Sequence, residues 1–228
     1  MYIRKVRVMP SDASITGEIK PYNLLNMLQD TAELAVEGIE GKSTELYARG
    51  YSWVVTRYEM NICGKLPKIC EEFEVVTYHD PHHSYNTLRN FHVRHGGQEV
   101  VTAKTSWILA DVRTGRPVKP LAHIPGIDTG DCEPIADDFA DMPKFDAADE
   151  AETFTVKYHD TDYNGHVNHA IYFRWIYDML GIIPRKTAAS FRSGAKLGEV
   201  ITIERSGNNF RVMRENNPRP CAEITVSE

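Results

Sequence analysis

The sequence predicts an α+β protein built from two similar units, each an antiparallel sheet wrapped around one long helix. Two observations support this prediction. The order strand, loop, helix and then several strands occurs twice along the 228 residues. A segment rich in Pro, Gly, Asp and Ala separates the two occurrences. We therefore expect an N-terminal unit at residues 1–120, a linker at 121–150 and a C-terminal unit at 151–228.

The N-terminal half opens with an alternating strand at residues 2–8 and a turn at 10–14. Apolar residues at helical spacing then predict a helix over 21–39, which begins with Pro21 and ends near Gly41. Runs rich in Val, Thr, Tyr, Phe and Trp predict the strands that follow. These strands are residues 51–63, 72–79, 85–95 and 99–111.

The C-terminal half repeats this order. Residues 153–158 read as a strand, 160–167 as a polar loop and 168–180 as a helix with one apolar stripe that includes Trp175 and Ile176. Gly181 and Pro184 are suited to end that helix. The remaining strands are predicted at 187–192, 199–204, 210–214 and 222–226.

The charge is unevenly distributed. The chain has a net charge of −6, yet residues 128–150 alone hold nine acidic residues and one lysine. The rest is close to neutral, which argues against a nucleic-acid-binding surface. No apolar run reaches the roughly 18 residues that span a membrane, and the first residues do not read as a leader. We expect a cytoplasmic protein with no membrane partner.

The polar loop at 158–169 is the densest cluster of chemically active side chains. It precedes a helix, whose N-terminus carries a partial positive charge that can stabilise an oxyanion. Asp162 and His166 can supply acid–base function, and Gly165 permits backbone conformations that other residues avoid.

Other interpretations of this loop compete. Asp160, Asp162, Asn164 and Gly165 match the first half of a calcium-binding EF-hand loop, but position twelve is Ile171 where Glu is needed. Asp and Asn also form turns and helix caps, for which Asn168 is suitable. Cysteine–histidine catalysis is disfavoured because no cysteine lies near the loop.

The residues from Asp160 to Tyr172 resemble a known signature, Asp-Thr-Asp-x-x-Gly-His-Val-Asn-x-Ala-x-Tyr. It is similar to that of the hot-dog thioesterases, and the spacing of Asp162, Asn164, His166 and Asn168 resembles the plant and bacterial acyl-ACP thioesterases. Three N-terminal stretches strengthen the resemblance. They are Asn26 to Ala32, Trp53 to Arg57, and Thr105 to Trp107 with the later Thr114 to Arg116.

The resemblance implies two tandem hot-dog units, with the acyl chain bound largely by the first and catalysis supplied by the second. It implies hydrolysis of fatty acyl-ACP thioesters, with acyl carrier protein as partner and no cofactor. The implied catalytic residues are Asp162, Asn164 and His166. The expected substrate-binding residues are Asn168, Trp53 and Arg57.

One position departs from the family pattern. The family usually has a Glu, sometimes followed by Cys, in the strand after the second helix, and the matching residues here are Gly194 and Ala195. Neither can act as acid, base or nucleophile. Glu199 is a substitute candidate, although a glutamate at a strand end is usually a solvated charge.

Several alternatives stay open. The chain could act on acyl-CoA, or bind acyl thioesters without catalysis, and the attack could be covalent or by water. We expect no metal site, because His92 and His95 point to opposite faces of a strand. The tandem units could form a monomeric pseudo-dimer or a homodimer. Arg185, Lys186, Arg192 and Lys196 could form a basic patch for a carrier protein, or simply be solvated.

Overall fold

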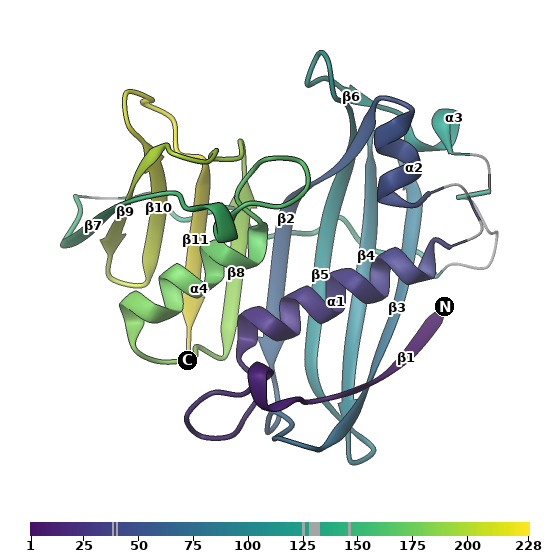
Figure 1. Ribbon diagram of the computed structural model, residues 1–228, viewed down its shortest axis with the longest axis horizontal. Coiled ribbons are helices and arrows are strands. Elements are labelled where there is room, and N and C mark those ends of the chain that lie inside the picture. Colours follow the sequence, from purple (N-terminus) through teal and green to yellow (C-terminus); the bar gives the residue numbers. More distant parts are fainter. Residues whose placement is uncertain (38, 40, 125, 128–132, 146) are drawn as a thin grey trace. The chain divides into compact units, whose positions relative to one another are not determined.

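The computed structural model describes residues 1–228 except 38, 40, 125, 128–132 and 146 (Figure 1). The chain divides into two compact units. Unit 1 holds residues 1–56 and 60–138, and unit 2 holds residues 57–59 and 139–228. Within the described residues, no helix combines the length and the apolar character needed to cross a membrane.

Unit 1 contains an antiparallel sheet with the strand order β1-β3-β4-β5-β2, and β6 pairs with the far part of β5. The strands are β1 (Tyr2–Arg7), β2 (Tyr51–Ile62), β3 (Glu72–His83), β4 (Asn86–His95), β5 (Gln98–Asp111) and β6 (Pro117–Val118). The helices are η1 (Pro10–Asp12), α1 (Pro21–Ala35), α2 (Ser43–Ala48) and α3 (Pro120–His123).

Helix α1 crosses the face of this sheet over β3, β4 and β5 (Figure 1). Pro21 occupies its first turn, where the missing N–H group costs nothing. Leu24, Leu25 and Leu28 are fully buried on one side, because their spacing places them along one stripe. The apolar stripe therefore forms the core with the inner face of the sheet.

The structure differs from the sequence-based boundaries at several places. Helix α1 ends at Ala35 rather than at residue 39, and the short helix α2 follows it unpredicted. Strand β3 continues past the predicted end at residue 79 to His83. Pro81 lies in this extension, and the register shifts between Asp80 and His83 as expected for a residue that cannot donate to the ladder.

Unit 2 contains the antiparallel order β8-β11-β10-β9-β7. Its elements are β7 (Glu150–Thr155), η2 (Tyr158–Asp160), α4 (His169–Leu180), β8 (Lys186–Phe191), β9 (Val200–Ser206), β10 (Asn209–Arg214) and β11 (Ala222–Ser227). The predicted helix at 168–180 is thus confirmed, with Asn168 as its cap. The strand predicted at 153–158 is wrong in its bounds, because β7 begins at Glu150 and ends at Thr155, and the chain turns into η2 at Tyr158.

Helix α4 is bounded by two local signals. The Asn168 side chain accepts a hydrogen bond from the Ala170 N–H group, and Gly181 ends the helix with φ of +67°. Phe173 and Ile176, both on α4, are fully buried. Each described unit therefore pairs one long helix with an antiparallel sheet, which confirms the predicted α+β class.

Candidate functional site

The predicted catalytic residues lie on one tight turn between η2 and α4. The Asp162 N–H group donates to the His166 carbonyl at 2.8 Å, and the Gly165 N–H group donates to the Asp162 carbonyl at 3.0 Å. Gly165 has φ of +73°, a conformation that favours glycine. This closure brings Asp162, Asn164 and His166 together at alternate positions of one short segment.

The Asp162 carboxylate is both a structural and a chemical element of this turn. Its Oδ1 atom accepts the backbone N–H of Asn164 at 2.9 Å and that of His166 at 3.4 Å. Burial raises the pKa of Asp162, and the hydrogen bonds from Asn164 and His166 oppose that rise. The Asx-turn interpretation is therefore confirmed for Oδ1, while the raised pKa is typical of a carboxyl group suited to proton transfer.

The Asp160 carboxylate, two residues earlier, has a structural role. It is buried, accepts the Lys157 N–H group at 2.9 Å and pairs with Arg174 at 2.8 Å. Its backbone carbonyl also accepts the Asn168 N–H group. Asp160 therefore fastens η2 to the start of α4 and holds the turn in place.

The first residues of α4 are occupied by packing and capping. The Asn168 side chain caps the helix, so its expected contact with substrate stays a prediction. The His169 ring lies 5.7 Å from the Tyr58 ring, and both residues belong to unit 2. Burial lowers the pKa of His169 to about 4, so this imidazole is neutral near pH 7.

The bare backbone of Gly194 lies directly against His166. A Cβ atom at position 194 would approach the His166 Cβ to 2.7 Å and its Cγ and Cδ2 atoms to 2.8 Å. A backbone bridge from His166 to Lys196 and a hydrogen bond from Val167 N to the Ala195 carbonyl fix this approach. The volume that a side chain at 194 would fill is thus occupied by His166.

Glu199, the substitute candidate for the missing acid, is bound elsewhere. Its Oε2 atom accepts the Lys196 N–H group at 2.9 Å, and its Oε1 atom lies 3.8 Å from Arg214. It lines a surface hollow together with Arg214 and Asn217. Its observed contacts are therefore those of a residue that closes the turn between β8 and β9.

Within the predicted basic patch, Arg192 forms an ion pair with Glu223. Arg192 donates to the Glu223 carboxylate through two nitrogen atoms, at 3.0 and 2.5 Å. Arg185, Lys186 and Lys196 have exposed side chains. All four residues of the predicted patch are therefore exposed, and the charge of Arg192 is paired with that of Glu223.

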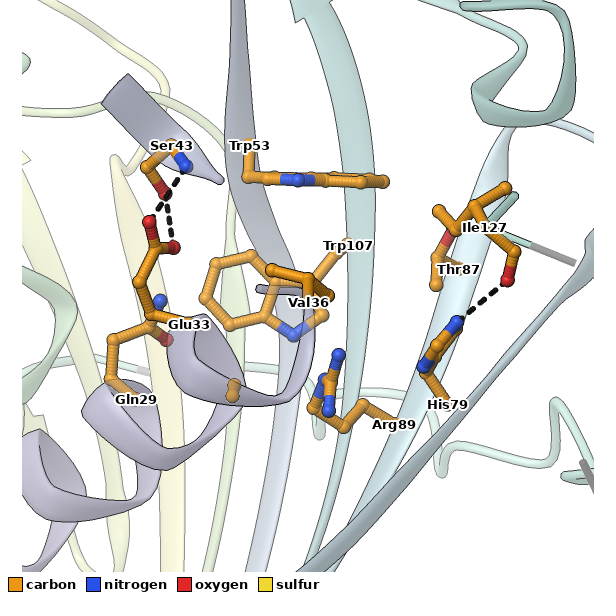
Figure 2. Close-up of a pocket in the computed structure, with 11 residues that line it drawn as sticks. Gln29, Glu33, Val36, Ser43, Trp53, His79, Thr87, Arg89, Trp107 and Ile127 are labelled. Atoms are coloured by element: carbon orange, nitrogen blue, oxygen red, sulfur yellow. Dashed lines mark hydrogen bonds between the residues drawn. The ribbon is translucent and has the colours of Figure 1, made fainter. Parts of the chain in front are cut away.

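Trp53 and Arg57, the two other expected substrate contacts, lie in different places. Trp53 lines a cavity of about 40 Å³ within unit 1, which we call the N-terminal pocket (Figure 2). Arg57 belongs to unit 2, where it donates to the Ala140 carbonyl and lies 5.6 Å from the Phe139 ring centroid. The pocket lining does not include Arg57, and its role in substrate binding stays a prediction.

The histidines of β3 and β4 make hydrogen bonds with carboxylates. His82 and His83 both bond Asp80, and His92 bonds Glu99. Burial opposes the ionisation of Asp80, but hydrogen bonds, the first from the Ile135 N–H group, lower its pKa to about 2. Among the described residues, no group of three or more His, Cys, Asp or Glu is arranged to hold a metal ion.

Several polar residues of the N-terminal pocket were not predicted from the sequence, among them Thr87 and Arg89. Both are buried on β4. Their positions two apart in a strand place them on one face, which was a signal available from the sequence. Arg89 was not predicted to be buried, because arginine is almost never buried without a partner.

Comparison with known proteins gives consistent matches along the chain. Residues 1–124 match the family model "Acyl-ACP thioesterase N-terminal domain", and residues 144–209 match "Acyl-ACP thioesterase C-terminal domain". A chloroplastic acyl-[acyl-carrier-protein] hydrolase of Cuphea viscosissima is 27% identical over 172 residues. That match covers 67% of this chain and spans 40% of the length of the plant protein.

Two solved structures share the fold over nearly the whole chain. An acyl-ACP thioesterase from Bacteroides thetaiotaomicron has a TM-score of 0.83 at 20% identity, with 99% of this chain and 96% of that chain covered. A 12:0-ACP thioesterase from Umbellularia californica has a TM-score of 0.82 at 18% identity, with the same coverage of each chain. These matches confirm the predicted tandem hot-dog fold.

Proposed function

The chain belongs to the acyl-ACP thioesterase family, whose first domain matches residues 1–124, and we propose that it hydrolyses fatty acyl-ACP thioesters to free fatty acid and carrier protein. The observation that carries the proposal is the turn that gathers Asp162, Asn164 and His166 before α4. Acyl transfer needs a group that accepts a proton or attacks the carbonyl, and a donor that stabilises the oxyanion.

In the proposed reaction Asp162 takes a proton from the water that attacks the thioester carbonyl, or attacks the carbonyl itself. In the second case thiolate leaves and a mixed anhydride forms on Asp162, and water then hydrolyses the anhydride to release the fatty acid and regenerate the carboxylate. The half-buried carboxylate suits either role, because burial makes it a stronger base than a solvated aspartate. The partial positive charge at the N-terminal end of α4 stabilises the negative charge that develops on the carbonyl oxygen. Asn164 positions the carbonyl or the water, and His166 protonates the departing thiolate.

The proposed partner is acyl carrier protein, which presents the acyl group on a phosphopantetheine thiol. The exposed Arg185, Lys186 and Lys196 support this choice, because they can attract an acidic protein surface. We assign acyl binding to the N-terminal unit and catalysis to the C-terminal unit. The cytoplasmic location and the oligomeric state stay predictions.

A second candidate function follows from Gly194. A hot-dog protein that lacks the usual acid could bind acyl thioesters without cleaving them, and this alternative predicts tight binding with no thiol release. An acyl-CoA thioesterase is the third candidate. It would release thiol faster from the CoA thioester than from the ACP thioester of the same acyl chain.

One assay separates the three candidates. Thiol release is measured with a chromogenic disulfide for matched acyl-ACP and acyl-CoA substrates from octanoyl to stearoyl. The proposed function expects release that is faster from acyl-ACP and that Asp162→Ala abolishes. Release that favours CoA would support the CoA enzyme, and binding without release from any substrate would support the non-catalytic protein.

The pH dependence of kcat/KM provides a further test. The proposed base must be ionised, so the rate falls as the pH drops through the pKa of Asp162. Because burial raises that pKa, we expect the acidic limb of the profile to lie above the position of an ordinary aspartate. The measurement uses acyl-CoA alongside acyl-ACP, since ionisation of the carrier protein would move only the second profile. If the acidic limb lay at the pH of an ordinary aspartate for both substrates, Asp162 would not be the base.

A further inference from the structure

The N-terminal pocket lies between α1 and the inner face of the unit 1 sheet (Figure 2). Its apolar walls include Ala32 from α1, Val36 directly after that helix, and the rings of Trp53 and Trp107 from the sheet. A plain acyl chain is matched by a predominantly apolar lining, in which polar groups are few. The polar side chains that share this lining therefore need an explanation.

The strand register places those polar side chains side by side. Arg89 on β4 lies opposite His79 on β3 and opposite Thr105 on β5, and Thr87 lies opposite Trp107. Directly opposed residues project from the same face of a sheet. The inner face thus carries a polar row across three strands, beneath the helix that closes the pocket.

Arg89 is a buried cation that forms no ion pair with any of the residues that the structure describes. Its side chain is 6% exposed, and one Nη1–H group donates to the Thr77 hydroxyl at 3.1 Å. Burial lowers its pKa to about 10, so it remains charged near pH 7. Within the described part of the chain no carboxylate lies within 4.0 Å of it. A guanidinium has five N–H groups, and a buried one is costly unless acceptors face it.

Thr87 supplies a second unsatisfied group in the same pocket. Its side chain is 5% exposed, and its Oγ1 atom is buried without a hydrogen-bond partner among the described residues. The hydroxyl of Thr105, by contrast, donates to the Arg89 carbonyl and accepts from the Trp107 ring. Thr87 and Arg89 thus leave unused donors at the edge of one small cavity.

We propose that the N-terminal pocket receives the far end of an acyl group that carries a neutral oxygen, as a hydroxyl or an oxo group. This substrate class rests on the proposed function, which places acyl binding in this unit. The oxygen accepts hydrogen bonds from Arg89 and Thr87, while the two tryptophan rings and Val36 contact the chain. The side chain of Arg89 points into the pocket toward Trp107 in Figure 2.

The charges around the pocket favour a neutral oxygen over a carboxylate. Glu33 lines the same pocket, and its negative charge already attracts Arg89. Its carboxylate bonds the Ser43 N–H and hydroxyl groups at 2.7 Å, away from Arg89 (Figure 2). A second carboxylate would meet this charge in a site of low dielectric constant. His79 is neutral, since burial lowers its pKa to about 4.

Equilibrium binding tests the proposal independently of catalysis. The probes are decanoic, dodecanoic and tetradecanoic acids, their ω-hydroxy and penultimate-oxo derivatives, and the corresponding dicarboxylic acids, titrated into the intact protein by calorimetry. We expect an ω-hydroxy or oxo acid to bind about tenfold or more tightly than the plain acid of equal length. Thr87→Val, which keeps the volume of the side chain, should remove most of that preference.

The control is Thr102→Val on β5, a half-buried threonine on the opposite face of the strand from Thr105 and outside the pocket lining. It should leave the preference unchanged. Equal binding of plain and oxygenated acids would mean that a water molecule fills the cavity, and it would overturn the proposal. Tightest binding of a dicarboxylic acid, or no binding of any probe, would overturn it as well. The thiol-release assay decides the proposed function separately from all of these outcomes.

Discussion

Asp162→Asn is expected to lower kcat for acyl-ACP hydrolysis by about 10²–10⁴-fold, the range for loss of one acid–base group. The fold should survive, because the amide oxygen of asparagine can still accept the N–H groups of Asn164 and His166. Burial raises the pKa of Asp162, so folding disfavours its ionised form. Replacing it with a neutral amide should leave the urea midpoint unchanged or slightly higher.

The control is Asp178→Asn, which changes an exposed carboxylate on α4, the helix that follows the turn. It removes the same charge at a distance from the turn and should keep kcat close to that of the wild type. Urea melts of both variants distinguish lost chemistry from lost structure. An Asp162→Asn protein that is folded and turns over at the wild-type rate would remove Asp162 from the mechanism.

The elements that local signals define were predictable from the sequence. Helix α4 has a capping Asn168, an apolar stripe and a terminal Gly181, and its predicted span agrees with the structure to one residue. The end of α1 was predicted four residues too late, because apolar residues continue to Ile39 after the helix has stopped. The extension of β3 beyond Pro81 depends on pairing with β4, which a proline normally argues against.

The site was predictable only where its residues are close in the sequence. Asp162, Asn164 and His166 belong to one motif, and their turn follows from Gly165 and the Asx geometry. Arg89 was missed because its burial results from the packing of α1 on the sheet. The contact of Gly194 with His166 likewise joins residues that only the folded sheet brings together.

Gly194→Ala is expected to destabilise the protein by about 1–3 kcal/mol, the usual cost of overpacking a filled site. The added Cβ atom would meet His166 at 2.7 to 2.8 Å. Rotation of the imidazole gives only partial relief, because one of the clashing atoms is the His166 Cβ, which the backbone bridge to Lys196 holds in place. The turn itself must shift, so kcat should fall with the stability.

A double-mutant cycle assigns this cost to one contact. In a His166→Gly background, which removes every clashing atom, Gly194→Ala should cost little stability. In a His166→Ala background, which keeps the Cβ atom, the cost should be intermediate. Lys196→Ala, an exposed neighbour of Gly194, should show no coupling to the His166 side chain.

The same cycle tests why this chain has Gly194 where the family usually has a Glu. The structure places His166 in the volume that a side chain at position 194 would occupy, so a Glu at 194 and His166 in its present position exclude each other. If Gly194→Ala costs the same stability in the wild type, His166→Ala and His166→Gly backgrounds, the contact with His166 is not the reason for glycine at 194. If the cost falls as atoms of residue 166 are removed, then glycine at 194 is needed for His166 to lie beside Asp162 and Asn164. The reaction must then proceed with the acid–base groups of that turn.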